Sequence, residues 1–222
     1  MSLERLQKQL GYEFNQPALL KQALTHRSYA SNNNERLEFL GDGVLNFIVA
    51  HQLYQRFQKI PEGDLSRLRA QLVKEATLFE ISLSLKLGEL LNLGEGELKS
   101  AGWRRPSILS DALEAIIGAT YLDGGFAAAE ALVCKLYEER FENIDPKSID
   151  KDAKSKLQEY LQSKKIDLAD YTVISVEGEA HAQTFKVSCS INKLNITTLG
   201  EGTSRRNAEQ QAAELALEEI LL

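Results

Sequence analysis

The sequence predicts two domains: an all-α domain followed by a smaller α+β domain with the element order α-β-β-β-α. Residues 1–143 carry apolar side chains at three- and four-residue spacing nearly throughout, which is typical of packed helices. Residues 144–151 are polar and contain a proline, as linkers often do. Residues 152–222 combine helical segments with short runs that are rich in β-branched and aromatic residues. The change of period near residue 150 therefore marks the domain boundary.

The first domain contains two long apolar helices, which we predict at residues 34–57 and 108–122. Turn signals interrupt the helical stretches, for example IPEG at residues 60–63 and LDGG at residues 122–125. Apolar residues cover most of the circumference of the 34–57 helix, including the flanks of its one polar stripe. We therefore expect this helix to be mostly buried rather than amphipathic at the surface.

The second domain contains two predicted helices, at residues 154–163 and 204–222. Between them lie three predicted strands, at residues 171–177, 184–191 and 194–201. A three-stranded antiparallel sheet with both helices on one face is the simplest packing, because only one face of the sheet then stays in water.

Composition and charge exclude several classes of protein. The formal net charge of the 222 residues is -6 and neither half is basic, so a nucleic-acid site would have to rest on local clusters. No uncharged apolar run reaches the roughly 18 residues of a membrane helix, and charges replace the apolar stretch of a signal peptide. We therefore expect a cytoplasmic protein. Cys134 and Cys189 are far apart and predict neither a disulfide framework nor a zinc site.

Acidic residues occupy one face of each long helix. At about 100° per residue, a stripe about 80° wide on the first helix contains Glu35, Glu38, Asp42 and Asn46. On the second helix Asp111 and Glu114 share a face, and Gly118 continues that face. Together with Gly41 on the first helix, Gly118 would let the two backbones approach closely.

If the two faces meet, they form an oxygen-rich negative pocket that suits a hard divalent cation, Mg²⁺ or in its place Mn²⁺. Buried carboxylates must either take up protons or bind a counter-charge. A bound cation would activate water and stabilise charge on a phosphate. A solvated charged face is the usual explanation of an isolated Glu-x-x-Glu, but the apolar flanks argue against it here. A di-iron bundle requires Glu-x-x-His, a spacing not found before His26, His51 or His181.

Three segments resemble the characteristic blocks of the ribonuclease III endonuclease domain, in order and at the expected separations. They are residues 23–42 (ALTHRSYASNNNERLEFLGD), 61–73 (PEGDLSRLRAQLV) and 108–125 (ILSDALEAIIGATYLDGG). Residues 151–222 resemble the double-stranded RNA-binding domain that follows it in bacterial ribonuclease III. The domains implied are a nuclease domain at 1–143, a linker at 144–151 and an RNA-binding domain at 152–222.

The resemblance implies a magnesium-dependent endoribonuclease that cuts double-stranded RNA. Its metal ligands would be Glu38, Asp42, Asp111 and Glu114, of which Asp42 and Glu114 would be catalytic. Glu35 and Glu62 match accessory acids. The family further implies a homodimer through the endonuclease domain, 5′-phosphate and 3′-hydroxyl products, and processing of ribosomal, messenger and transfer RNA. None of the acids is lost, which argues against the alternative of a non-catalytic RNA-binding protein.

In the second domain the resemblance implies three RNA-contacting regions. They contain Gln158 and Glu159 in the first helix, His181 in the loop between the first two strands, and Ser204, Arg205 and Arg206 at the start of the last helix. The third region agrees with elementary electrostatics, because a helix N-terminus and two guanidinium groups both attract phosphate. Taken singly, each of these residues would be interpreted as ordinary surface.

Two further segments are interpreted as structural. The THRS of residues 25–28 is expected to cap and pack around the catalytic helix. Trp103, with Arg104 and Arg105 beside it, is expected in a surface loop, with an RNA contact left open. The sequence also leaves open the number of ions per site, the transcripts cut and the orientation of the domains.

Overall fold

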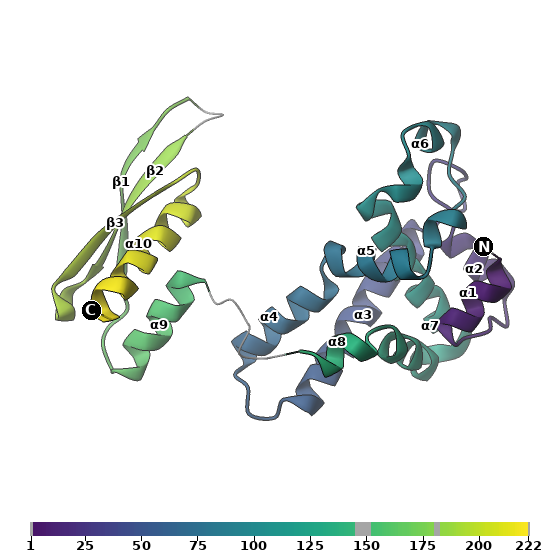
Figure 1. The fold of residues 1–222 in the computed structure, drawn as a ribbon, viewed down its shortest axis with the longest axis horizontal. Coiled ribbons are helices and arrows are strands. Elements are labelled where there is room, and N and C mark those ends of the chain that lie inside the picture. The colour runs from purple at the N-terminus through teal and green to yellow at the C-terminus, as the bar shows by residue number, and fades with distance from the viewer. Residues whose placement is uncertain (1, 145–151, 180–182, 222) are drawn as a thin grey trace. The chain divides into compact units, whose positions relative to one another are not determined.

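The computed structural model describes residues 2–144, 152–179 and 183–221. The chain forms two compact units, Met1–Ile149 and Asp150–Leu222. Apart from Ile144, the linker predicted at residues 144–151 lies outside the described residues. The predicted fold classes are confirmed: the first unit is helical, and the second is a three-stranded sheet with two helices (Figure 1).

The first unit consists of helices of very different lengths. In chain order they are α1 (Leu3–Leu10), α2 (Pro17–Ala23), α3 (Glu35–Arg56), α4 (Glu62–Val73), α5 (Glu75–Ser84), η1 (Leu87–Glu89), α6 (Glu95–Lys99), η2 (Gly102–Arg104), α7 (Pro106–Leu136) and α8 (Glu138–Glu142). The longest of them, α3 and α7, pack against each other more extensively than any other pair in this unit. This pair forms the centre of the unit.

Two glycines allow the close approach of α3 and α7. A Cβ atom at Gly41 would collide with the backbone carbonyl of Glu114, and one at Gly118 would collide with the backbone carbonyl of Leu37. The central residues of α7, such as Leu113 and Ile116, are completely buried. The backbone contact and the burial of apolar residues therefore hold the acidic face of α3 against that of α7.

The turn signal at residues 122–125 coincides with a break in the second long helix. The helix α7 spans Pro106–Leu136, but Gly125 within it has the non-helical angles φ 78° and ψ -175°. The helix therefore kinks at the predicted turn, and a second helical stretch follows it. Glycine adopts this left-handed φ without the steric clash that a Cβ atom would cause.

The prediction that the 34–57 helix is mostly buried holds for only part of its circumference. Leu45, Ile48 and Val49 are completely buried. In contrast, Phe39 is 83% exposed and Tyr54 is 73% exposed, and Phe47 is also exposed. Apolar residues all around a helix require a partner on every side, and a single chain supplies α3 with only some of them.

Within the described residues, one helix, α7, is long and apolar enough to cross a membrane, judged by length and composition. Its central residues are buried against α3 and α5. A core helix of a folded domain passes the same test, and the packing of α7 matches that case.

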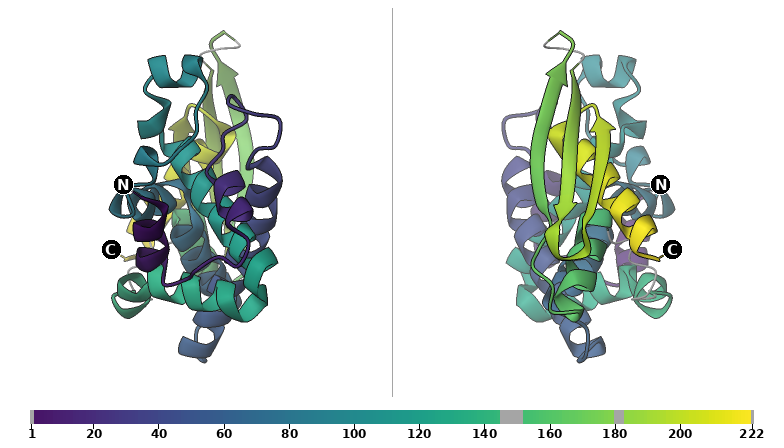
Figure 2. Two further views of the ribbon diagram at one scale, coloured as in Figure 1. Left: turned by 90° about the vertical axis from the view of Figure 1, so that its right-hand side faces the viewer. Right: turned by 90° about the vertical axis from the view of Figure 1, so that its left-hand side faces the viewer.

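The second unit has the predicted order, with α9 (Ala153–Ser163), β1 (Asp170–Glu177), β2 (Thr184–Ile191), β3 (Ile196–Gly202) and α10 (Arg205–Leu221). The sheet is antiparallel in the order β1-β2-β3. Leu157 and Leu161 of α9 share one apolar core with Cys189 and with Ala212 of α10. Both helices therefore cover the same face of the sheet, and the other face is turned to the viewer in the right-hand view of Figure 2.

Candidate active site

Three carboxylates meet where α3 and α7 touch. Glu38 of α3 and Asp111 and Glu114 of α7 each offer an oxygen atom, and these atoms all lie within 4.8 Å of one another. We call these three residues the acid cluster. Asp111 and Glu114 are one helical turn apart, and the glycine contact brings Glu38 to the same level. All three side chains are half-buried.

The acid cluster has no cationic partner at ion-pair distance among the residues that the structure describes. Burial, followed by the negative charges of Asp42, Asp111 and Glu38, raises the pKa of Glu114 to about 8. Burial is also the main cause of the raised pKa of Glu38 and of Asp111. Because like charges crowd a partly desolvated space, the cluster must either hold protons or bind a cation.

Asp42 lies beside the acid cluster but outside the group of three. Its Oδ1 accepts a hydrogen bond from Nδ2 of Asn46, at 2.8 Å, one turn further along α3. It is exposed, and its charge acts on Glu114 and on Glu38. Three of the four predicted ligands thus form the compact group, and the fourth is their neighbour.

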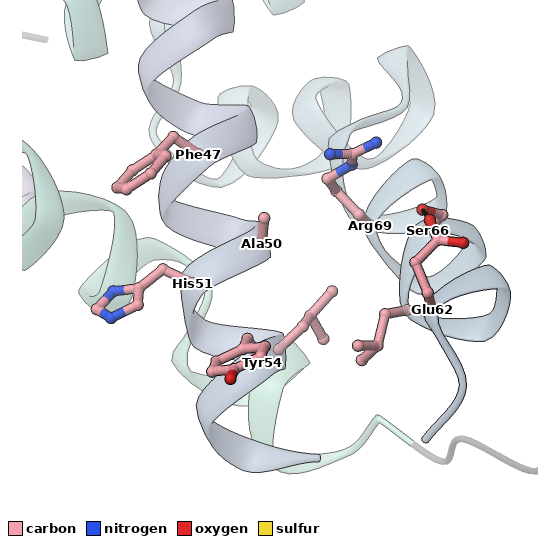
Figure 3. A pocket seen from close by; sticks show the side chains of 9 residues that line it. Phe47, Ala50, His51, Tyr54, Glu62, Ser66 and Arg69 are labelled. Carbon is pink, nitrogen blue, oxygen red and sulfur yellow. Dashed lines mark hydrogen bonds between the residues drawn. The ribbon is translucent and has the colours of Figure 1, made fainter. Parts of the chain in front are cut away.

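The two accessory acids lie at different places. Glu35 is at the first position of α3 and forms an exposed ion pair with Arg27, at 3.3 Å. Glu62 begins α4, and its Oε1 accepts a hydrogen bond from Ser66. Figure 3 shows Glu62 beside Ser66 and across a pocket from Tyr54 of α3. Glu35 therefore adjoins the acid cluster within the chain, whereas Glu62 lines a separate pocket.

Sequence reasoning missed a polar pocket of about 290 Å³ that adjoins the acid cluster. Glu38 and Asp111 form one part of its lining, and the residues His26, Arg27, Asn34 and Arg105 form another. Arg105 is exposed just before α7, as expected for a surface loop, and it also lines this pocket. Within the THRS segment, Thr25 has the expected structural role, because its Oγ1 donates to the backbone carbonyl of Lys21. His26 and Arg27 instead face the pocket.

Comparisons with known proteins show the family to which this chain belongs. A family model described as Ribonuclease-III-like matches residues 16–140, and a double-stranded RNA binding motif model matches residues 153–220. The chain is 59% identical over 220 residues to a protein named Ribonuclease 3 from Cupriavidus taiwanensis, covering 99% of this chain and 86% of that one. It is 57% identical over 218 residues to Ribonuclease 3 from Aromatoleum aromaticum, covering 98% and 97%. This chain belongs to the ribonuclease III family.

Solved structures extend the comparison. The crystal structure of the nuclease domain of ribonuclease III from Campylobacter jejuni has a TM-score of 0.62 and 49% sequence identity, and covers 65% of this chain and 99% of that one. Another structure of that domain is described as showing structural flexibility in a region involved in dimer formation. Ribonuclease III enzymes are endoribonucleases, and the family assignment makes this chain an enzyme of that class with an RNA-binding second domain.

The predicted RNA-binding residues that the structure describes lie on α9 and at the start of α10. Gln158 and Glu159 are exposed on α9. At the start of α10, the Oγ atom of Ser204 accepts from the backbone N–H of Asn207, while Arg206 is exposed. His181 lies outside the described residues.

Arg205 has a carboxylate partner that the sequence analysis overlooked. Its Nε donates to Glu209 at 2.8 Å, and Nζ of Lys154 donates to the same carboxylate at 2.6 Å. Burial acts to raise the pKa of Glu209, but the hydrogen bonds and charges of Lys154 and Arg205 together lower it. The four-residue spacing of Arg205 and Glu209 was the signal available in the sequence.

Proposed function

We propose that this protein is a magnesium-dependent endoribonuclease that cleaves double-stranded RNA to 5′-phosphate and 3′-hydroxyl ends. The observation that carries the proposal is the acid cluster, in which three carboxylates from two apolar helices converge without an ion-pair partner among the described residues. Family membership and the second domain supply the substrate class. In the cell we expect it to process ribosomal RNA precursors and some messenger and transfer RNA transcripts in the cytoplasm.

The donor set suits Mg²⁺, with Mn²⁺ as a substitute. The three converging ligand atoms are all carboxylate oxygens, which hard cations prefer over nitrogen or sulfur ligands. We assign Glu38, Asp111 and Glu114 as residues that hold the ion, with Asp42 beside them. When bound, such an ion lowers the pKa of water and offsets negative charge on the phosphate.

The acids of the chain position the reacting groups and do not attack the RNA. A water molecule attacks the scissile phosphate in line, the bond to the 3′-oxygen breaks, and that oxygen takes up a proton. Glu114 and Asp42 are assigned as the catalytic acids, as the family resemblance implies, and the negative charge of Asp42 acts on Glu114. The raised pKa of Glu114 belongs to the metal-free site, where a bound cation would displace the proton that Glu114 holds.

The second domain is proposed to bind the duplex through three regions. Gln158 and Glu159 on α9 reach one minor groove, the loop containing His181 reaches the next, and the start of α10 binds the intervening phosphates. At that helix start we assign Ser204, Arg205 and Arg206. The proposal is supported by the exposure of these side chains on α9 and α10. The domains are assigned as residues 1–143 and 152–222, with a linker at 144–151.

We further propose a homodimer formed through the endonuclease domain, with Glu35 and Glu62 as accessory acids. The exposed aromatic residues of α3, Phe39, Phe47 and Tyr54, are an apolar face of a kind that monomers rarely leave in water. The pocket in Figure 3 lies along the same helix. A second copy would cover this face.

A single experiment tests the activity. Purified protein is incubated with a long RNA duplex in Mg²⁺ and in EDTA, and the products are resolved on a gel and their ends mapped. We expect cleavage only with the metal ion, and ends that carry 5′-phosphate. An intact duplex in Mg²⁺, despite demonstrated binding, would instead identify a non-catalytic RNA-binding protein on a nuclease scaffold.

A further inference from the structure

The polar pocket beside the acid cluster is lined by two chemically different kinds of group. Its carboxylates are Glu38 and Asp111 of the acid cluster, with Glu35 and Glu97. Arg27 and Arg105 contribute guanidinium groups to the same pocket, together with the imidazole of His26. A group bound there would therefore meet both carboxylates and N–H donors.

Each arginine is anchored by a carboxylate of its own. Arg27 pairs with Glu35 at 3.3 Å, and Arg105 pairs with Glu97 at 3.1 Å. A guanidinium group has five N–H donors, so one ion pair leaves other donors for a ligand. Both arginines are still substantially exposed to solvent. Each arginine therefore keeps N–H donors that can bind a ligand.

Asn34 gives the strongest indication of a missing ligand. It lines the pocket and is 2% exposed, and its side-chain Nδ2 has no hydrogen-bond partner in the part of the chain that the structure describes. Its backbone is fixed at both ends, since its N–H donates to Thr25 and its carbonyl accepts from Glu38. A buried amide donor without a partner is costly and rare. The ligand that satisfies it must be a hydrogen-bond acceptor.

His26 contributes another donor. Its Nδ1 accepts a hydrogen bond from the backbone N–H of Ser28, at 3.2 Å. In a neutral ring this bond leaves the proton on Nε2, which is then a donor. Arg27, Asn34, Arg105 and His26 therefore contribute N–H groups to the pocket, which Ser107 and Ile108 also line.

We propose that this pocket binds a phosphate group of the RNA strand at or next to the cut, through Arg27, Arg105 and the Asn34 amide. A phosphate oxygen is the acceptor that these donors require, and arginine favours phosphate through its forked, charged donors. The pocket would hold the strand in register while the acid cluster acts on the neighbouring bond. This inference rests on the proposed nuclease function and adds the residues that fix the strand.

The test uses short product duplexes, which carry no bond left to cut, and measures their affinity for the full chain in Mg²⁺. Three duplexes are compared: one with a 5′-phosphate, one with a 5′-hydroxyl, and one with a 5′-phosphate and a neutral methylphosphonate at the first internal linkage. Each is titrated against wild type, Arg105→Gln and Arg104→Gln. Arg104 is the matched control, since it is the adjacent arginine and stacks on Trp103 outside the pocket.

One of the two phosphate changes is expected to weaken wild-type binding about tenfold, as loss of a charge-assisted hydrogen bond would. In Arg105→Gln the same change should weaken binding less than threefold, while Arg104→Gln should behave as wild type. We call this dependence of the loss on Arg105 the coupling. The duplex that shows the coupling identifies the bound phosphate as the terminal one or its neighbour. Equal losses in wild type and in Arg105→Gln would overturn the proposal, and so would no loss with either duplex.

Two further measurements keep the result interpretable. If Arg105→Gln lowers the temperature of thermal unfolding, the test is repeated with Arg27→Gln. Asn34→Asp replaces the amide donor by an acceptor of the same shape, and it should remove the same coupling. Cleavage of a long duplex by wild type is followed in parallel. If wild type cleaves the long duplex but shows no coupling, only the phosphate pocket is contradicted. If wild type does not cleave the long duplex, the proposed function is contradicted as well.

Discussion

Glu114 in the first unit and Glu209 in the second are both carboxylates on helices that are largely withdrawn from water, yet their surroundings are opposite. Glu209 is bonded to Lys154 and Arg205, which lower its pKa. Glu114 has acidic neighbours, and its pKa is raised to about 8. A buried acid with cationic partners stabilises the fold. A buried acid among other acids is unfavourable until something else supplies positive charge, which is the usual situation of a functional site.

The same substitution at the two glutamates should separate these roles most strongly in the cleavage rate. Glu114→Gln keeps the volume and removes one negative charge, so we expect cleavage of a long duplex in Mg²⁺ to fall about a hundredfold or more. Duplex binding should be retained. Glu209→Gln should change cleavage at low salt only severalfold. Near-normal cleavage by Glu114→Gln, measured in single-turnover gels, would remove the acid cluster from the mechanism.

The backbone contact that assembles the acid cluster can be broken without touching an acid. Gly118→Ala places a Cβ atom against the carbonyl of Leu37 and should destabilise the first unit by about 1–3 kcal/mol, as overpacking does. Cleavage should fall as well. Gly43→Ala is the control, because nothing lies within 4 Å of a Cβ atom there, and alanine favours a helix by up to about 1 kcal/mol. Thermal unfolding that moves equally in both variants would contradict the close helix contact.

Stability without metal should change in opposite directions at the two glutamates. Glu209→Gln removes the partner of two cations and should lower the thermal transition of the second unit by an amount equivalent to about 1 kcal/mol. Glu114→Gln removes a like charge from the acid cluster, so the first unit should become more stable by a similar or smaller amount. Differential scanning calorimetry in EDTA near pH 8 measures both. A loss of stability in both variants would mean that Glu114 also has a structural partner.

The smallest expected effect is the pH dependence of metal stabilisation. Without metal, folded Glu114 keeps its proton up to about pH 8, whereas the unfolded chain releases it near the ordinary carboxyl pKa. The folded state therefore binds more protons between these values, and stability falls as pH rises through that range. Glu209 behaves oppositely, since the stability that it contributes is lost as pH falls through its lowered pKa.

A cation competes with the proton for Glu114. Mg²⁺ should therefore raise the temperature of thermal unfolding by more at pH 8 than at pH 6. An increase independent of pH would contradict this exchange.

Much of the fold and of the acid cluster could be predicted because periodicity reports directly on helix faces. The stripe containing Glu38, and Asp111 with Glu114, stood out against apolar flanks, and the glycines indicated that the helices touch. The glycine pair at residues 124–125 indicated the break in α7, where Gly125 is non-helical, but not the second helical stretch that follows it. The exposure of Phe39 was missed because an apolar pattern does not distinguish a core from a surface awaiting a partner.

The polar pocket could not be found in the sequence, because its members come from segments that only the fold brings together. Asn34 precedes α3, and Arg105 precedes α7. Nothing near either residue in the sequence indicates an unpaired amide or a guanidinium that faces the acids. The placement of Asp42 beside the group of three depends on a side-chain hydrogen bond to Asn46, which spacing alone does not specify.

Gly41 and Gly118 also mean that inactive alleles can arise at codons that encode no reactive side chain. Every missense change at either position adds at least a Cβ atom at the point where the two backbones meet. A random mutagenesis screen for loss of processing should therefore recover these two codons about as readily as those of the carboxylates. The active site therefore depends on the absence of two side chains as well as on the presence of its carboxylates.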